Sequence, residues 1–242
     1  MSRMARGAAR VTAVVLLAGL VSGCAGARQD TQGINDPYEA DNRAMHEFNK
    51  KIDSALFKDA SLPDPVLRPL VNVGGNLGLP SKIVNSLLQG RLEPAGQNFF
   101  RLVLNSTLGV AGIFDVAQSF GLPEVDTDFG ETLYVWGMGE GPYMELPLLG
   151  PSTERDALGR VVDIALDPVG LALSGHDARV ATAFTLGSKV GDRLRFGGVI
   201  DSVLYESADS YAQSRLLYLQ SRRHQLSGQE KNDADAFDPY AE

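Results

Sequence analysis

The chain has 242 residues, with 22 basic and 30 acidic side chains and a net charge of −8 at neutral pH. A surface this acidic is a poor ligand for nucleic acid and a poor electrostatic match for anionic lipid headgroups. The single cysteine excludes an intrachain disulfide, so a folded domain must be held together by its core.

The first 23 residues have the three parts of a secretory signal peptide. Arg3, Arg6 and Arg10 precede an apolar run over residues 11–21, and small residues follow. The run is too short to span a bilayer, which takes about 20 helical residues. We therefore expect residues 1–23 to be removed after export.

The end of this segment, Val21-Ser22-Gly23-Cys24, has the pattern of a lipobox. It predicts cleavage between Gly23 and Cys24 and acylation of the Cys24 thiol, which would anchor the protein firmly. An uncleaved membrane anchor that contains an apolar cysteine is the alternative, which the short run disfavours. Ala25, in place of an aspartate, favours sorting to the outer membrane.

The mature chain divides into three parts. Residues 24–34 are small and polar, as expected of a flexible, lipid-anchored tether. Residues 225–242 are acidic with few aliphatic side chains, and we predict a disordered tail. Residues 35–224 are sufficient for one folded domain.

The first predicted helix of this domain runs from Pro37 to Phe57. Asp36 is the expected N-cap, with Pro37 at the first helical position. Asn42 and Asn49 lie on other faces than the apolar stripe. The stripe has spacings of three and four residues and consists of Met45, Phe48, Ile52 and Leu56.

A second helix is predicted from Pro80 to Gly90, and the most apolar region begins at Pro94. In that region only Arg101 and Asn105 form a polar strip. A helix that is apolar on nearly all sides is either central core or faces lipid. Glycines at 109 and 112 are expected to divide it.

Beyond this region, residues 129–137 are predicted as a short helix or turn, and the segment from Tyr143 to Leu149 as an extended hairpin arm. Helical periodicity returns over residues 153–173, 178–196 and 199–224. The fold class is therefore mainly α, with little β structure.

The sequence shows no catalytic, metal or cofactor site. His46-Glu47 begins like a zinc-protease motif, but Lys50 stands where the second histidine is required. No Gly-x-Ser-x-Gly elbow occurs, and Ser174 close to His176 is not a triad. We therefore expect no enzyme. Lys189, Arg193 and Arg195 are candidates for binding a phosphate, although a solvated helix face is the favoured interpretation.

Four segments resemble the MlaA/VacJ family of outer-membrane lipoproteins. They are NDPYEADNRAMHEFN (35–49), LVLNSTLGVAGIFDVAQSFGLP (102–123), TDFGETLYVWGMGEGPYMELPLLGP (127–151) and STERDALGRVVD (152–163). With a looser match over residues 209–223, the resemblance covers nearly all of the expected domain.

The resemblance implies a single ring-shaped helical domain in the inner leaflet of the outer membrane, on its periplasmic side, with a central amphipathic channel. Mislocalised phospholipids would pass through this channel from the outer leaflet to a periplasmic carrier protein, beside a porin trimer, so that lipid asymmetry is maintained. It also implies that Phe48 and Asn49 belong to a gating helix. An outer-membrane phospholipase and a passive scaffold remain the alternatives.

Overall fold

The computed structural model describes residues 33–58 and 60–236. The signal segment 1–23, Cys24 and most of the tether lie outside the described residues, so cleavage, acylation and tethering remain predictions. No helix within the described ranges is both long enough and apolar enough to cross a membrane.

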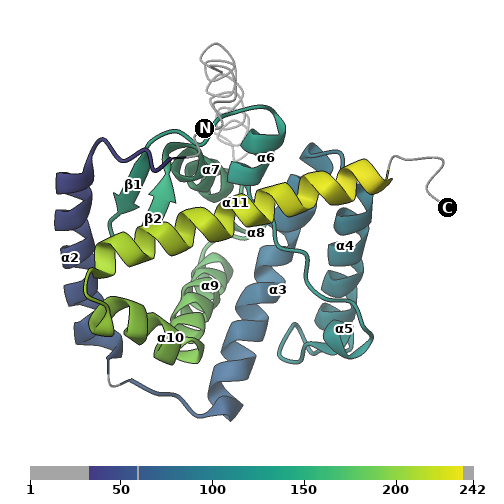
Figure 1. Cartoon of the computed structure of the whole chain (residues 1–242). Helices are drawn as coiled ribbons and strands as arrows, with labels where there is room; N and C mark the ends of the chain where they lie inside the picture. The colour runs from purple at the N-terminus through teal and green to yellow at the C-terminus, as the bar shows by residue number, and fades with distance from the viewer. Residues whose placement is uncertain (1–32, 59, 237–242) are drawn as a thin grey trace, which may run out of the picture.

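The described chain is mainly helical, as predicted (Figure 1). Its helices are α2 (Glu39–Phe57), α3 (Asp64–Leu88), α4 (Leu92–Thr107), α5 (Val116–Ser119), α6 (Phe129–Val135), α7 (Glu154–Ala165), α8 (Pro168–Ala172), α9 (His176–Arg195), α10 (Gly197–Asp201), the short π-helix η1 (Ser202–Glu206) and α11 (Ser210–Ala236).

The predicted hairpin arm is present. Strands β1 (Tyr143–Leu146) and β2 (Gly150–Thr153) pair antiparallel, with Leu146 opposite Gly150. The turn between them places Leu148 at a φ of 63° and leaves its side chain exposed. Helix α2 packs against β1, and α7 packs against both strands.

Helix α3 packs against both α4 and α9, and α11 crosses the molecule from the side of α2 to the side of α4 (Figure 1). The helix crossing between α3 and α9 is close. A Cβ on Gly74 would lie 2.3 Å from the Cβ of Ser188, so glycine is required there. A single domain therefore contains all the described elements.

The predicted N-cap of the first helix is wrong. Helix α2 begins at Glu39, and its N-cap residue, Tyr38, makes no side-chain cap. The Asp36 carboxylate instead accepts hydrogen bonds from Asn42 Nδ2 (2.9 Å), the Tyr211 hydroxyl and Arg215. Because α11 supplies two of these donors, the carboxylate joins two helices rather than capping one.

The predicted start of the second helix at Pro80 is also wrong, because α3 begins at Asp64 and includes Pro69 and Pro80. Each internal proline removes one helical hydrogen bond. Packing of α3 on α4 and α9 offsets that loss. The predicted stop is confirmed: α3 ends at Leu88, and Gly90 follows with a φ of 76°.

The last predicted helix, over residues 199–224, is interrupted in the structure. Ser207 is extended, and the Asp209 carboxylate accepts from the Ala212 N–H at 3.0 Å, so that a new helix begins at Ser210. This helix continues to Ala236, and Leu226 is buried. The expectation of a disordered tail from residue 225 is therefore wrong for residues 225–236, and residues 237–242 lie outside the described part.

Candidate functional site

Helix α2 turns its polar side toward the domain. Asn42 and His46 are buried, whereas Phe48 and Leu56 of the apolar stripe are 48% and 60% exposed. The inward residues Asn42, His46, Asn49 and Asp53 are spaced by four, three and four, which places them on one helix face. The predicted amphipathic pattern is present, but the inward face is polar, and within the apolar stripe Phe48 and Leu56 are exposed while Met45 and Ile52 are half-buried.

Helix α4 also turns a polar face inward. Arg101 and Asn105, the polar strip of the sequence, are buried. Asn98, fully buried beside them, donates to the Val125 carbonyl at 2.8 Å and accepts from its N–H at 3.2 Å. Phe99 and Phe100 on the opposite face are 50% and 59% exposed. Helix α4 is therefore not a fully buried core helix, because its apolar face points away from the domain.

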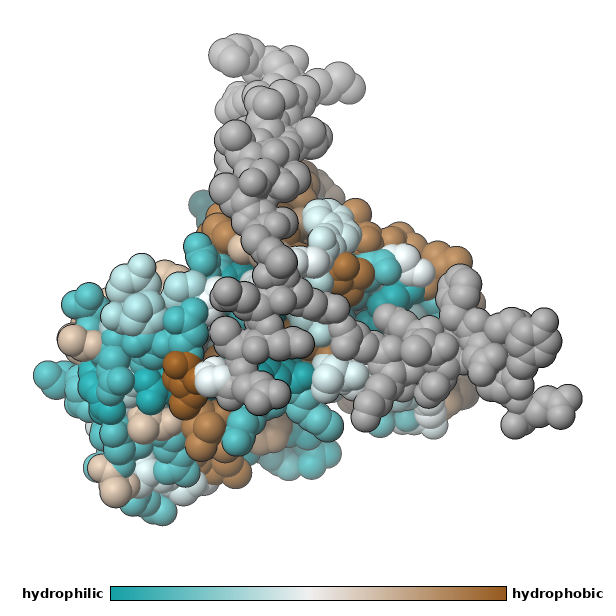
Figure 2. All heavy atoms as spheres, turned by 45° about the horizontal axis from the view of Figure 1, so that its top comes forward, coloured by the Kyte–Doolittle hydropathy of each residue, from teal (hydrophilic) through white to brown (hydrophobic). Residues whose placement is uncertain are grey.

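Many of the exposed hydrophobic side chains lie on α4 and the segments beside it, and Figure 2 shows brown on that side of the molecule; others lie on α7, α8, α9 and α10. We call the area on and beside α4 the apolar surface. A patch of this extent marks a contact with protein or membrane rather than with water. It comprises Leu87, Leu88, Leu92, Phe99, Phe100, Val103, Leu108, Val110, Phe114, Val135 and Trp136.

The loop after α4 stores backbone strain. Val110 and Ala111 have φ values of 52° and 56°, which are unfavourable for residues with a Cβ, above all for a β-branched one. The adjacent Gly112 N–H donates to the Asn105 carbonyl at 2.8 Å, and Asn72 Nδ2 donates to the Ile113 carbonyl at 3.0 Å. These bonds hold the loop in the shape that exposes Val110.

Beneath the apolar surface, the buried side chains of the described residues are more often polar or charged than hydrophobic. Asp156 is one centre of this polar core. Its carboxylate accepts from Arg155 (3.0 Å), Tyr218 (2.5 Å) and Arg222 (3.2 Å). Burial favours the neutral acid, but the two guanidinium groups outweigh it and lower the pKa of Asp156 below its usual value.

Glu145 of the hairpin is a second centre. Its carboxylate accepts from the Tyr143 hydroxyl at 2.6 Å and from Asn49 at 3.3 Å, and it lies 3.4 Å from His46 Nδ1. His46 Nε2 lies 3.1 Å from Ser210 Oγ at the start of α11. Three distant segments, α2, β1 and α11, therefore meet at one buried histidine, which the sequence suggested only as part of an incomplete zinc-protease motif.

The two residues of the expected gating helix have different environments. Asn49 donates to the Leu146 carbonyl at 2.9 Å and accepts from the Leu148 N–H at 2.7 Å, so it holds the hairpin turn against α2. Phe48 points outward and is about half exposed. Only Asn49 of the pair is a bridge within the domain. Whether they gate anything stays a prediction.

A groove of about 1190 Å³ runs between the first half of α3 and the segment that follows the strained loop. Its lining is mixed: hydrophobic side chains alternate with charged ones. Arg195 contributes to it from the end of α9, whereas Arg193 is bound by Asp53 and Asp201, each at 2.6 Å. The other lining residues include Leu67, Arg68, Val71, Ile113, Phe114 and Val116.

Glu131, fully buried in α6, gives the polar core a pH dependence. Burial raises its pKa from 4.5 to about 7, although Arg91 lies 3.1 Å away. The folded protein therefore retains a proton that the unfolded chain has already released. The stabilisation by this proton is complete below pH 4.5 and is lost as the pH rises to about 7.

We expect Glu131→Gln, which mimics the protonated acid, to match the wild type at pH 5 and to be the more stable protein at pH 8. The difference should be on the order of 2 kcal/mol. Thermal unfolding of both proteins across this range measures it, with the exposed Glu93→Gln as the control. Parallel melting temperatures of wild type and Glu131→Gln would refute the assignment.

Comparison with known proteins gives one consistent result. A family model described as MlaA lipoprotein matches residues 34–225. The "Intermembrane phospholipid transport system lipoprotein MlaA" of Shigella flexneri is 34% identical over 245 residues, which cover 94% of this chain and 95% of that protein. The protein of the same name from Escherichia coli (strain K12) is 37% identical over 164 residues, 64% of this chain and 65% of its own length.

A solved structure, described as "Structural basis for maintenance of bacterial outer membrane lipid asymmetry", contains a chain with the same fold. It superposes with a TM-score of 0.62 at 28% sequence identity, over 79% of this chain and 98% of that one. Since the family model spans nearly the whole described domain and the relatives match over most of their length, the chain belongs to the MlaA lipoprotein family.

Proposed function

We propose that this protein is an outer-membrane lipoprotein that removes mislocalised phospholipids from the outer leaflet and passes them to a periplasmic carrier, which maintains lipid asymmetry. The apolar surface is the observation on which the proposal rests. Hydrophobic side chains point away from a hydrogen-bonded polar core, an arrangement suited to contact with acyl chains. The names of the relatives, which refer to phospholipid transport, support phospholipid as the molecule that is contacted.

The mixed groove beside α3 is the passage in this proposal. A phospholipid has a charged headgroup and two apolar tails, and it needs a path with both kinds of lining. Leu67, Val71 and Ile113 would contact tails, while Arg195 would meet a phosphate. Within the described residues Arg195 has no carboxylate partner, which leaves its charge free for a ligand.

Function requires anchoring at Cys24 in the periplasmic leaflet of the outer membrane. Cys24→Ala is expected to give a protein that is exported but neither acylated nor cleaved at this site, because no other thiol exists in the chain. Mass spectrometry of the mature N-terminus measures this. An unlipidated wild-type N-terminus would refute the anchor, whereas inner-membrane fractionation would refute only the sorting inferred from Ala25.

The partners in this proposal are a porin trimer beside the domain and a soluble lipid carrier in the periplasm. Both come from the family resemblance. Nucleic acid is not among the proposed partners, because a protein with a net charge of −8 is repelled by the phosphate backbone.

Lipid transfer makes and breaks no covalent bond, so the proposed function includes no enzymatic activity. The chain of Ser210, His46 and Glu145 has the order of a catalytic triad, with separations of 3.1 and 3.4 Å. However, Ser210 is buried, and the Asp209 carboxylate already accepts from the Ala212 N–H at the helix start, where an oxyanion would need such donors. A purified protein that released fatty acid, and lost this activity in Ser210→Ala, would establish the phospholipase instead.

Deletion of the gene tests the proposal as a whole. Loss of transport should raise phospholipid in the outer leaflet and increase sensitivity to detergent, and the wild-type gene should restore both. Unchanged lipid asymmetry would favour a scaffold over a transporter.

A further inference from the structure

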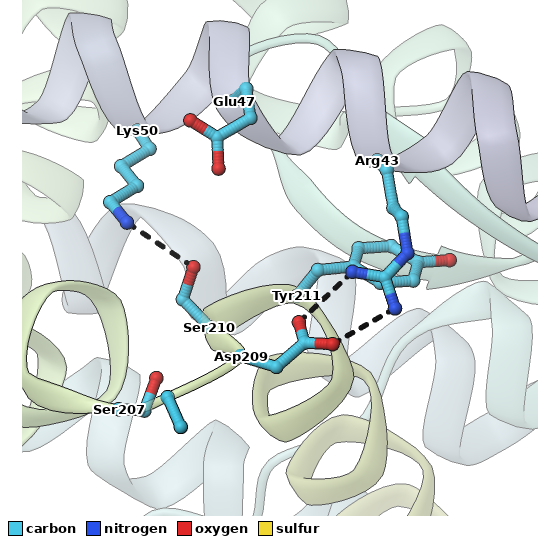
Figure 3. Close-up of a pocket in the computed structure, with 8 residues that line it drawn as sticks. Arg43, Glu47, Lys50, Ser207, Asp209, Ser210 and Tyr211 are labelled. Atoms are coloured by element: carbon cyan, nitrogen blue, oxygen red, sulfur yellow. Dashed lines mark hydrogen bonds and ion pairs between the residues drawn. The ribbon is translucent and has the colours of Figure 1, made fainter.

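A second cavity, distinct from the groove, lies between α2 and the start of α11 (Figure 3). It has a volume of about 420 Å³. Helix α2 contributes Arg43, Glu47 and Lys50, and the other wall is residues 207–211. These α2 residues lie on a different flank of the helix from the apolar stripe. The cavity is therefore polar and set apart from the apolar surface.

One side of the cavity is closed by a complete ion pair. The Arg43 guanidinium binds both carboxylate oxygens of Asp209, at 3.0 and 2.9 Å, and also binds Glu39 at 2.8 Å. It lies 4.5 Å from the centre of the Tyr211 ring. Arg43 and Asp209 thus satisfy each other and form a wall without net charge.

Glu47 and Lys50 are the two charges that remain. Figure 3 shows both side chains directed into the cavity, from positions three residues apart on α2. Lys50 Nζ donates to Ser210 Oγ at 3.4 Å, a long bond, and lies 5.8 Å from the centre of the Tyr205 ring. Within the described part of the chain neither forms an ion pair, with the other or with any third residue.

Opposite charges that share a cavity without pairing fit a ligand with both charges. We propose that the cavity binds a phosphoethanolamine headgroup, with its phosphate at Lys50 and its ammonium at Glu47. This inference rests on the proposed function and adds a headgroup preference to it. Ionised partners on both sides give hydrogen bonds that are stronger than neutral ones.

The same chemistry predicts which headgroups bind less well. A glycerol headgroup offers no cation to Glu47, so the carboxylate gains nothing from it. A choline headgroup has a cation but no N–H, and it cannot donate to a carboxylate. Ethanolamine is the one among these three that satisfies both side chains.

The test uses the full-length lipoprotein in nanodiscs that contain equal amounts of phosphatidylethanolamine, phosphatidylglycerol and phosphatidylcholine. Native mass spectrometry counts the lipid molecules retained after mild release. Wild type should retain phosphatidylethanolamine over each of the others by roughly tenfold, the effect of one charge-assisted hydrogen bond. Glu47→Gln should abolish that preference and still retain phospholipid. Lys50→Met should reduce retention of phosphatidylethanolamine by a similar factor.

Two exposed residues outside the cavity are the matched controls: Lys51→Met on the same helix and Glu93→Gln on α4 should behave as wild type. Glycerophosphoethanolamine and inorganic phosphate, added separately, distinguish the sources of the ligand. Competition by glycerophosphoethanolamine alone supports the proposal, and equal competition by inorganic phosphate shows a simple phosphate site and overturns it. If lipid is retained but its composition is the same in Glu47→Gln, the headgroup site is refuted and transport stands; if no lipid is retained by any variant, the proposed function itself is refuted.

Discussion

Deleting Phe48 and Asn49 together is expected to raise outer-leaflet phospholipid, whereas Phe48→Leu is expected to leave it close to the wild-type level. Removal of two residues rotates the rest of α2 by about 200°, at about 100° per residue. Asn42 and His46 then cannot face the domain together with Asp53, which binds Arg193 at 2.6 Å. One half of the helix must lose its polar contacts, and the hairpin turn loses Asn49.

Phe48→Leu keeps an apolar side chain on the outward face, so it tests the stripe without changing the rotation. Asn49→Ala removes only the three side-chain hydrogen bonds to the hairpin and should have an intermediate effect. Lipid asymmetry is compared among the three variants at matched protein levels. A deletion that behaves as wild type would remove Phe48 and Asn49 from the site, and an equally damaging Phe48→Leu would show that the outward stripe, rather than the polar face, is decisive.

Replacing Asp156 by leucine should be among the most destabilising single substitutions in this domain. The change leaves two buried guanidinium groups, on Arg155 and Arg222, without their shared carboxylate. Loss of one partner of a buried ion pair costs about 3–5 kcal/mol. In a domain of this size, the melting temperature should fall by roughly 6–20 °C.

The matched substitution is Phe100→Ser on the apolar surface, which removes a large hydrophobic side chain that is 59% exposed. In detergent it should change the melting temperature by only a few degrees, because little buried area is lost. Thermal unfolding of both variants in the same detergent measures the contrast. A larger loss in Phe100→Ser than in Asp156→Leu would show an ordinary hydrophobic interior instead of a polar core.

Periodicity predicted most of the helices and the hairpin, since 3.6-residue and extended patterns depend on local sequence. It could not show which face of α2 or α4 points inward. An apolar face is usually buried in a protein that is surrounded by water, so periodicity alone could not predict the exposed Phe99 and Phe100 of α4. The spacing of Asn42, His46, Asn49 and Asp53 was the signal available, because four polar residues on one face indicate a polar interface.

The buried centres could not be predicted for a different reason. Glu145, His46 and Ser210 come from three segments far apart in the chain, and no local pattern joins them. The interior prolines of α3 led to a predicted helix that was too short. Their local cost is offset by packing of α3 on α4 and α9. Residues whose role depends on tertiary contacts were therefore the ones missed.

Trp136, the one tryptophan of the chain, allows a direct test of whether the apolar surface contacts acyl chains. It lies at the end of α6, is 51% exposed, and its indole N–H donates to the Leu88 carbonyl at 3.2 Å. The measurement is the quenching of its fluorescence in the lipidated protein in bilayers, by phospholipids brominated on their acyl chains and by aqueous iodide. Strong quenching by the brominated lipids with weak quenching by iodide is expected, and free access of iodide with no effect of the brominated lipids would contradict the proposed immersion of this surface in the membrane.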